Sequence, residues 1–241
     1  MSATSQKSKA EAHCEAQCEK ILASARKCFV ESGFHAANMA SIAQTAGMSA
    51  GLIYRYFQSK NAIILAIIAQ HLDEVQADIR QLPAGIEQIK ARIEQRFINW
   101  RDHEASGLEP GIFLEIAALA TREPQVAEAL RLADDRIRAE LGNWLLETWQ
   151  HAGYTLNPAE VAERVFALQS FIEGLIFRAI KQPGAELELV GTCVSALLAY
   201  LLPVGQKSSP GWNPICAGDQ HNQVSHPLSM AVDSTHLDFT E

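Results

Sequence analysis

The chain has 241 residues, of which 48% are hydrophobic and 20% charged, and its formal net charge is −8. This composition is ordinary for a soluble globular protein with room for a sizeable core. Its densest apolar stretches, residues 63–69 and 193–202, are too short to span a membrane. The N-terminal residues are rich in Ser and Lys and lack the apolar segment of a secretory signal, so we expect a cytoplasmic protein without membrane partners.

The charge is distributed unevenly along the chain. Residues 1–60 carry seven basic and four acidic side chains, a net charge of +3, whereas residues 61–241 carry 13 basic and 24 acidic ones, a net charge of −11. A modestly basic N-terminal part on an acidic body is typical of a small DNA-reading head. Residues 1–10, with Lys7 and Lys9, are predicted to form a flexible basic arm.

The cysteines give no sign of a disulfide framework, because five is an odd number and their spacing is irregular. Cys14 and Cys18 lie four residues apart beside His13, which allows a metal interpretation. A zinc site needs about four ligands, however, and no second pair lies at a suitable spacing. We therefore expect no metal and no cofactor.

The first predicted helix runs through apolar residues at helical spacing from Ile21 to Phe29. Gly33 is predicted to end it in the left-handed conformation, with Phe34 folding back onto the helix. Good capping residues precede three further helices, predicted over about 38–45, 49–57 and 60–82: Asn38, Ser49 and Ser59. Gly47 separates the first two of these, and the Pro-Ala-Gly sequence from Pro83 ends the third.

Further helical patterns follow, separated by Gly and Pro residues, over 86–104, 109–121, 124–151, 158–181 and 186–202. No segment has the sustained alternation of a β-strand. The sequence therefore predicts an all-α protein of about nine helices, with a small N-terminal helix-turn-helix domain and a larger helical body. Residues 204–241 contain several Pro, Gly and polar residues, so they are predicted to form a flexible tail. The histidines of this tail are too irregularly spaced to favour a metal site.

Residues 42–57 meet the packing demands of a helix-turn-helix. Ala43 is small where the two helices approach closely, and Gly47 tolerates the sharp turn. Apolar residues on both sides of the turn are expected to face the preceding helix: Ile42, Ala46, Met48, Ile53 and Phe57. The other face of the second helix is then free to enter a DNA major groove. An ordinary αα-hairpin shares the same packing demands, so this spacing alone leaves that alternative open.

Residues 21–67 resemble the DNA-binding domain of the TetR/AcrR family of regulators. The resemblance rests on fixed positions that run from Ile21-Leu22-x-x-Ala25 to Ile53-Tyr54-x-Tyr56-Phe57-x-Ser59-Lys60. The remaining chain matches the family only in its all-helical plan. The resemblance implies a DNA-binding domain over residues 11–60 that continues into the linking helix, an effector-binding and dimerisation domain over 83–203, and double-stranded operator DNA as a partner.

The resemblance also implies a set of DNA-contacting residues. Tyr54 and Tyr56 occupy the family's aromatic pair, Arg55 is the candidate for reading guanine, and Lys60 is expected to face a phosphate. The complete predicted set is Asn38, Ser41, Ser49, Ala50, Gly51, Tyr54, Arg55, Tyr56 and Lys60. The sequence departs from the family pattern in lacking polar side chains at three positions: Ala37, Ala40 and Ala50. These departures leave a larger share of recognition to Tyr54, Arg55 and DNA shape. Alternatively, the flexible basic arm that contains Lys7 and Lys9 adds contacts.

The family plan places the dimer contact on the last two helices, 158–181 and 186–202, which are apolar over wide faces. The alternative is that these faces only fill the core of one subunit. A small-molecule effector of unspecified chemistry is expected in the body, in an apolar pocket. Its predicted lining is Phe97, Trp100, Phe113, Glu115, Trp144, Phe166, Glu173 and Phe177.

The predicted function is that of a ligand-responsive regulator, most simply a repressor that binds a palindromic operator as a homodimer and is released by a small molecule. The alternatives are an activator of the same family and a helical interaction protein with a degenerate helix-turn-helix. No catalytic fingerprint, such as a phosphate-binding Gly loop or a nucleophile elbow, is present, so we do not expect an enzyme.

Overall fold

The computed structural model describes residues 9–83, 85–103 and 109–203, and every regular element within these ranges is a helix. The helices are α1 (Lys9–Ala36), α2 (Met39–Ala46), α3 (Ala50–Tyr56), α4 (Lys60–Arg80), α5 (Ile86–Arg101), α6 (Pro110–Ala120), α7 (Pro124–His151), α8 (Pro158–Lys181) and α9 (Leu187–Leu201). The all-α prediction is confirmed. No helix within the described ranges is long and apolar enough to cross a bilayer. Most of the predicted arm and all of the predicted tail lie outside these residues.

The short helices begin where the sequence provides capping side chains. The Asn38 side chain accepts a hydrogen bond from the Ser41 backbone N–H at 2.9 Å, and Ser41 Oγ accepts one from the Asn38 N–H at 3.0 Å, which forms a capping box at α2. The side chains of Ser49 and Ser59 cap α3 and α4 by accepting the N–H groups of Leu52 and Ala62. Gly47 ends α2 in the left-handed conformation (φ 61°, ψ 38°), which glycine adopts without steric penalty.

The end of α1 differs from the prediction. Gly33 has the expected positive φ of 74°, but its ψ of 161° lies outside the left-handed helical region, and the helical turns resume as far as Ala36. The reason is that the Phe34 N–H leaves the ladder of the helix and donates to the carboxylate of Glu115 on α6. Phe34 itself is buried, as predicted.

Two hydrophobic clusters make up the core. The first joins α1, α2, α3 and α4 with α6 and the N-terminal half of α7, and Ile42, Ile53 and Ile116 are nearly or fully buried in it. The second joins α5, α8 and α9 with the C-terminal half of α7 around Phe97 and Val194. Because α6 contributes to the same cluster as the helix-turn-helix, the core has no break at the predicted domain boundary near residue 83. That boundary stays a prediction.

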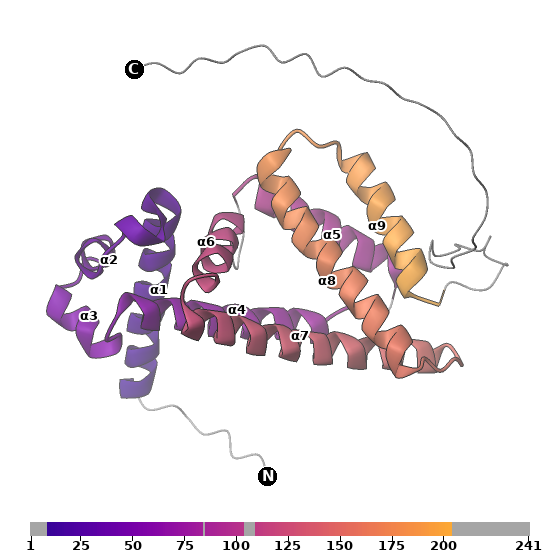
Figure 1. The fold of residues 1–241 in the computed structure, drawn as a ribbon, viewed down its shortest axis with the longest axis horizontal. Coiled ribbons are helices and arrows are strands. Elements are labelled where there is room, and N and C mark those ends of the chain that lie inside the picture. The colour runs from indigo at the N-terminus through magenta and orange to yellow at the C-terminus, as the bar shows by residue number, and fades with distance from the viewer. Residues whose placement is uncertain (1–8, 84, 104–108, 204–241) are drawn as a thin grey trace, which may run out of the picture. The chain divides into compact units, whose positions relative to one another are not determined.

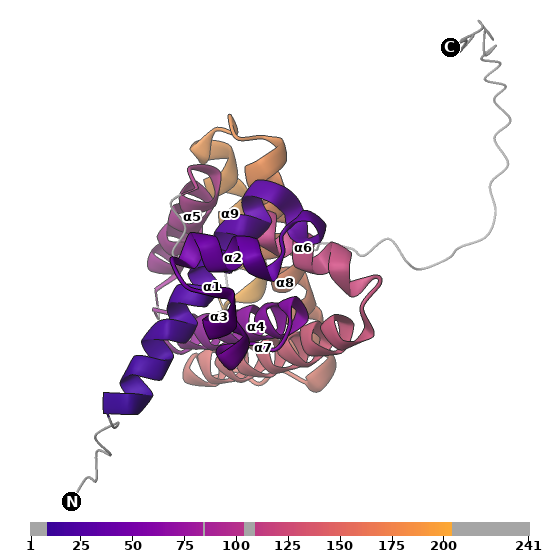
Figure 2. The same cartoon turned by 90° about the vertical axis from the view of Figure 1, so that its left-hand side faces the viewer.

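The helices connect the two clusters through one long pair. Figures 1 and 2 show α4 and α7 side by side, in agreement with their extensive mutual contact. Helix α1 packs against α2, α4 and α6, while α5 packs against α8 and α9. Helix α4, which follows the helix-turn-helix, therefore contributes residues to both clusters.

Candidate DNA-binding surface and effector cavity

The helix-turn-helix of α2 and α3 leaves one face of α3 open. Tyr54 is 52% exposed, and Ala50, Gly51 and Arg55 are also exposed. A Cβ atom built on Gly51 would meet no other atom within 4 Å, so this position lets the helix come close to another surface. Tyr56 is half-buried and packs against the first core cluster, which leaves only part of its side chain available to DNA.

Three of the predicted DNA-contacting residues cap helices in the free protein. Asn38 and Ser41 form the capping box of α2, and Ser49 accepts the Leu52 N–H at 3.3 Å. Asn38 and Ser49 are exposed and Ser41 is half-buried. Their side-chain oxygens help to fix the register of the two helices, and any phosphate contact would come in addition.

Lys60 lies differently from the prediction. Its ammonium does not point away from the protein toward a phosphate, because it donates to the backbone carbonyls of Phe34 and Ala37, the latter at 2.7 Å. It also lies 4.2 Å from the centre of the Phe34 ring, in a cation–π contact. Burial lowers the pKa of Lys60. The side chain thus holds the end of α1, where unpaired carbonyls favour a cation.

The body contains a cavity of about 280 Å³ between α4 and the later helices. Its wall is mostly apolar and includes Leu72 and Ile79 from α4, Ile93 from α5, Ile137 from α7 and Leu198 from α9. A volume of this size is close to the lower end of the range for small-molecule sites, ~300–1,000 Å³. The cavity is the candidate effector site.

Polar groups enter the cavity wall at two places. On α4 and α5, the carboxylate of Asp78 accepts hydrogen bonds from Arg92, at 2.8 Å, and from Arg96. Burial alone would raise the pKa of Asp78, but the two guanidiniums outweigh burial and hold that pKa below its ordinary value. His71 lines the cavity beside them.

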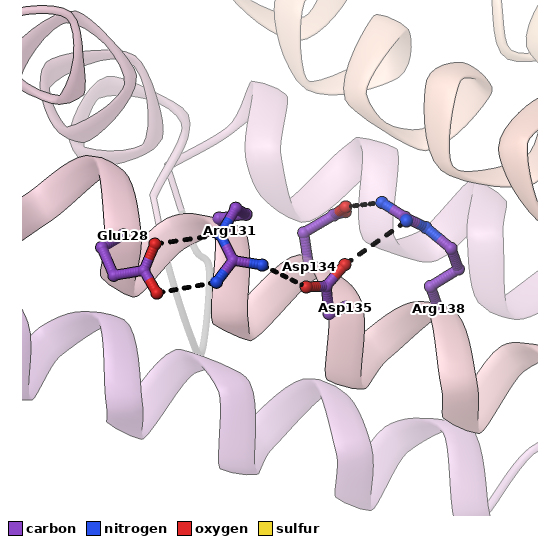
Figure 3. Close-up of polar contacts among 5 residues, drawn as sticks. All are labelled: Glu128, Arg131, Asp134, Asp135 and Arg138. Carbon is purple, nitrogen blue, oxygen red and sulfur yellow. Dashed lines mark hydrogen bonds and ion pairs between the residues drawn. The ribbon is translucent and has the colours of Figure 1, made fainter.

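The second polar place is formed by α7 and α8. Asp134 accepts a hydrogen bond from Gln169 Nε2 at 2.7 Å, and Glu173 lies at the rim. Burial, and then the neighbouring Asp134 carboxylate, raise the pKa of Glu173. Figure 3 shows that Asp134 also ends a row of ion pairs along α7, where Arg138 contacts it. The remaining members of that row are Glu128, Arg131 and Asp135.

Only part of the predicted pocket lining reaches this cavity. Trp100, Phe113 and Glu173 line it. Phe177 lines a second, more open hollow next to it, which Phe113 and Glu173 share.

The other four residues predicted to line the pocket do not line this cavity. Phe97 is fully buried within the second core cluster, and Trp144 packs against that cluster without reaching the cavity. Phe166 is 74% exposed because it lies on the outward face of α8. Glu115 does not orient a ligand, since its carboxylate is taken by the Phe34 N–H at 2.9 Å. Aromatic spacing along a helix does not distinguish these environments.

The sequence prediction missed the polar residues on α4 and α5. His71 and Asp78 are seven residues apart, and Arg92 and Arg96 are four apart, so each pair lies on one face of its helix. Polar pairs at helical spacing on the apolar face of a helix are the signal that could have found them.

Comparison with known proteins identifies the N-terminal part. Residues 21–67 match the model of the tetR family of bacterial regulatory proteins. The geometry of α2 and α3 and the all-helical body agree with this match. Residues 21–67 are therefore assigned to the tetR family.

Two curated transcriptional regulators each match about half of the chain. The transcriptional regulator UidR of Escherichia coli is 38% identical over 112 residues, which cover 46% of this chain and 56% of UidR. The transcriptional activator FasR of Mycolicibacterium smegmatis is 30% identical over 120 residues, 48% of this chain and 52% of FasR. The chain thus matches little more than half the length of either relative.

A solved structure extends the likeness of fold to the body. GusR of Salmonella enterica superposes with a TM-score of 0.63 over 77% of this chain and 95% of that protein, at 24% sequence identity. The likeness of fold to GusR therefore extends over most of the chain. Both curated relatives are named as transcriptional regulators, and no enzyme family is indicated.

Proposed function

We propose that the chain is a ligand-responsive transcriptional regulator that binds operator DNA through the exposed face of α3. The support for DNA binding is the open surface of Ala50, Gly51, Tyr54 and Arg55 on a capped, rigid helix, within the segment that matches the tetR family. Such a surface fits a major groove, where Arg reads guanine and tyrosine hydroxyls meet phosphates or base edges. Because it acts on the genome, the protein is proposed to work in the cytoplasm.

The active species is proposed to be a homodimer that joins α8 and α9 to a second copy. Five large hydrophobic side chains on or next to these helices are exposed: Phe166, Phe177, Ile180, Leu187 and Leu189. An exposed apolar face of this kind favours a protein interface, and two-fold pairing would present two heads to a palindromic operator.

One observation carries the proposed regulation. Helix α6 provides Phe113 and Ile116 to the cavity wall and, between them, Glu115 to the Phe34 N–H at the end of α1. A ligand that displaces Phe113 or Ile116 would move the acceptor that holds α1. Ligand binding would then favour head positions that no longer match the operator, which lowers the affinity for DNA.

Fluorescence anisotropy with labelled DNA from upstream of the protein's own gene tests this proposal. We expect salt-dependent binding that unlabelled specific DNA displaces and unrelated DNA does not. Equal affinity for both DNAs, or no binding, would contradict the proposal and favour the interaction-protein alternative.

Repression is proposed as the direction of regulation, since a bound dimer on a promoter blocks transcription. The name of FasR, a transcriptional activator, supports activation as the second candidate. A reporter gene under the bound promoter separates the two. Deletion of the regulator raises reporter output if the protein represses and lowers it if the protein activates.

A further inference from the structure

The cavity has one polar end with an excess of positive charge. Arg92 and Arg96 share a single carboxylate, that of Asp78, so the cluster keeps a net charge of +1. Arg92 also donates to the Gln81 carbonyl at 2.9 Å, which uses much of its hydrogen-bonding capacity. Among the described residues, the Nε and Nη2 groups of Arg96 have no acceptor of their own. These N–H groups are therefore free to bind an additional acceptor.

At the same polar end of the cavity, His71 has a ring nitrogen without a hydrogen-bond partner among the described residues. This nitrogen, Nδ1, is buried, although the side chain lines the cavity. Burial, and then the guanidiniums of Arg96 and Arg26, lower the pKa of His71 to about 4, while Asp78 acts in the opposite direction. The imidazole is neutral at physiological pH and can donate one N–H. A buried polar atom left unpaired is unfavourable, so a ligand that binds it gains affinity.

The opposite end of the cavity is less suited to a strongly bound charged group. Asp134 is already occupied by Arg138 and Gln169. Glu173 lies at the rim, where burial and the neighbouring Asp134 carboxylate both raise its pKa and so disfavour its charged form. The wall between the two ends is apolar and includes Trp100, whose ring centre lies 5.7 Å from the Arg96 guanidinium.

The volume limits the size of the ligand. At about 280 Å³ the cavity lies near the lower end of the range for small-molecule sites, ~300–1,000 Å³, which favours a small ligand. Its surface must be largely apolar, because most of the wall is.

We propose that the cavity binds a small amphiphilic carboxylate, with the carboxylate on Arg96 and His71 and the apolar part against Trp100 and the aliphatic wall. This inference rests on the proposed function, in which the same cavity is the effector site. A carboxylate accepts two hydrogen bonds side by side, which matches the fork of free N–H groups on Arg96 and the nearby imidazole. It also neutralises the excess charge of the Arg92–Asp78–Arg96 cluster.

Three probes of equal chain length and different head charge test the inference: octanoate, 1-octanol and octylammonium. Isothermal titration calorimetry on the full chain should give the tightest binding for octanoate. The Arg96→Gln variant should weaken octanoate binding by about tenfold or more, because a charge-assisted hydrogen bond is lost, and should leave 1-octanol within about twofold. The Arg96→Lys variant keeps the charge but loses the fork of N–H groups, so its octanoate affinity should fall between those of the unmodified protein and Arg96→Gln.

Arg80→Gln is the matched control, since Arg80 is an exposed α4 residue paired with Glu140 outside the cavity lining. It should leave octanoate binding unchanged. Failure of octanoate to bind, equal or tighter binding of octylammonium, or unchanged octanoate affinity in a folded Arg96→Gln protein would each overturn the carboxylate inference. Circular dichroism confirms that the variants are folded.

Operator binding by the same samples separates this inference from the proposed function. If octylammonium releases operator DNA and octanoate does not, the proposed function stands and the carboxylate inference is overturned. If the protein binds no operator DNA at all, the proposed function is overturned, and the octanoate calorimetry still decides the chemistry of the cavity.

Discussion

Glu115 accepts a hydrogen bond from the backbone N–H of Phe34 at 2.9 Å, across 81 residues of sequence. The carbonyl of the same Phe34 accepts a hydrogen bond from the Lys60 ammonium. Both polar backbone groups of one residue are therefore bound by charged side chains, one from α6 and one from α4. These two contacts connect the end of α1 to α6 and α4, in addition to the apolar packing of α1.

Two substitutions of Glu115 should destabilise the protein to different extents. Glu115→Gln keeps an acceptor oxygen but loses the charge, whereas Glu115→Ala leaves the Phe34 N–H unpaired. We expect the free energy of unfolding to fall by about 1 kcal/mol for the Gln variant and by roughly 2–3 kcal/mol for the Ala variant. Urea denaturation measures both, with the exposed α7 residue Glu147→Gln as the control. Equal effects of the Gln and Ala variants would contradict the role of charge in this bond.

Lys60 should contribute to stability more than to DNA affinity. Lys60→Met removes the cation from the carbonyls of Phe34 and Ala37, so the free energy of unfolding should fall by about 1.5–3 kcal/mol. The slope of log affinity for operator DNA against log salt should stay unchanged, whereas Arg55→Gln should reduce it by about 0.9 if Arg55 contacts a phosphate.

The control for Lys60 is Lys27→Met on α1, whose ammonium lies 3.9 Å from Glu31 and is mostly exposed. Exposed pairs of this kind contribute at most about 1 kcal/mol. If the slope of log DNA affinity against log salt becomes smaller in Lys60→Met, the result would support the predicted phosphate contact of Lys60.

Tyr54 should be needed for operator binding and dispensable for the fold. Its side chain is 52% exposed on α3, so Tyr54→Ala should change stability by no more than about 0.5 kcal/mol. The affinity for operator DNA should fall at least tenfold, because the ring and hydroxyl lie on the proposed contact face. Anisotropy titrations measure the affinity, and the exposed Tyr154→Ala serves as the comparison. Unaltered DNA affinity of the Tyr54 variant would place the contact face elsewhere.

A charge on the apolar face of α8 should separate the proposed dimer. Phe166→Asp places a carboxylate at a position that is 74% exposed in one subunit and buried in the proposed pair. Sedimentation velocity should show monomers for this variant and dimers for the unmodified protein, because an unpaired buried charge is unfavourable. Leu132→Asp, at an exposed position of α7, should remain dimeric. Dimers of Phe166→Asp at the same concentration would exclude this face as the interface.

His71 should make the folded state sensitive to acid. Burial and the nearby Arg96 and Arg26 guanidiniums lower its pKa to about 4 from 6.5, so between these pH values the unfolded chain binds a proton that the folded chain does not. Stability is then lost as the pH falls, by roughly 3 kcal/mol once the pH reaches about 4. Denaturant titrations of His71→Gln should lack this component, and the exposed His151→Gln should retain it.

Local chemistry explains why the helix-turn-helix could be predicted so closely. Asn38, Ser49 and Gly47 act through neighbours only a few residues away, so their capping and turn roles are contained in the sequence itself. The apolar periodicity likewise predicted Ile42 and Ile53 in the core, and both are fully buried. The family resemblance over residues 21–67 then separated a DNA-binding domain from an ordinary αα-hairpin.

The roles of Lys60 and Glu115 could not be predicted, because each depends on a partner brought near by tertiary packing. A lysine at the start of a helix is consistent with a phosphate contact until the end of α1 is known to lie within its reach. The same holds for Phe97 and Phe166, which share an apolar helical pattern but end up fully buried and largely exposed. Sequence periodicity predicts which residues share one face of a helix. It does not predict whether that face contacts the core, a cavity or solvent.

The bond between Glu115 and the Phe34 N–H also bears on engineering. A chimaera that joins residues 1–60 of this chain to the body of another regulator would inherit the kinked end of α1 without its acceptor. Such a hybrid would need a carboxylate at the position equivalent to Glu115 to pair the Phe34 N–H. Residues 1–60 should therefore be transferred to another body only if that body carries a counterpart of Glu115.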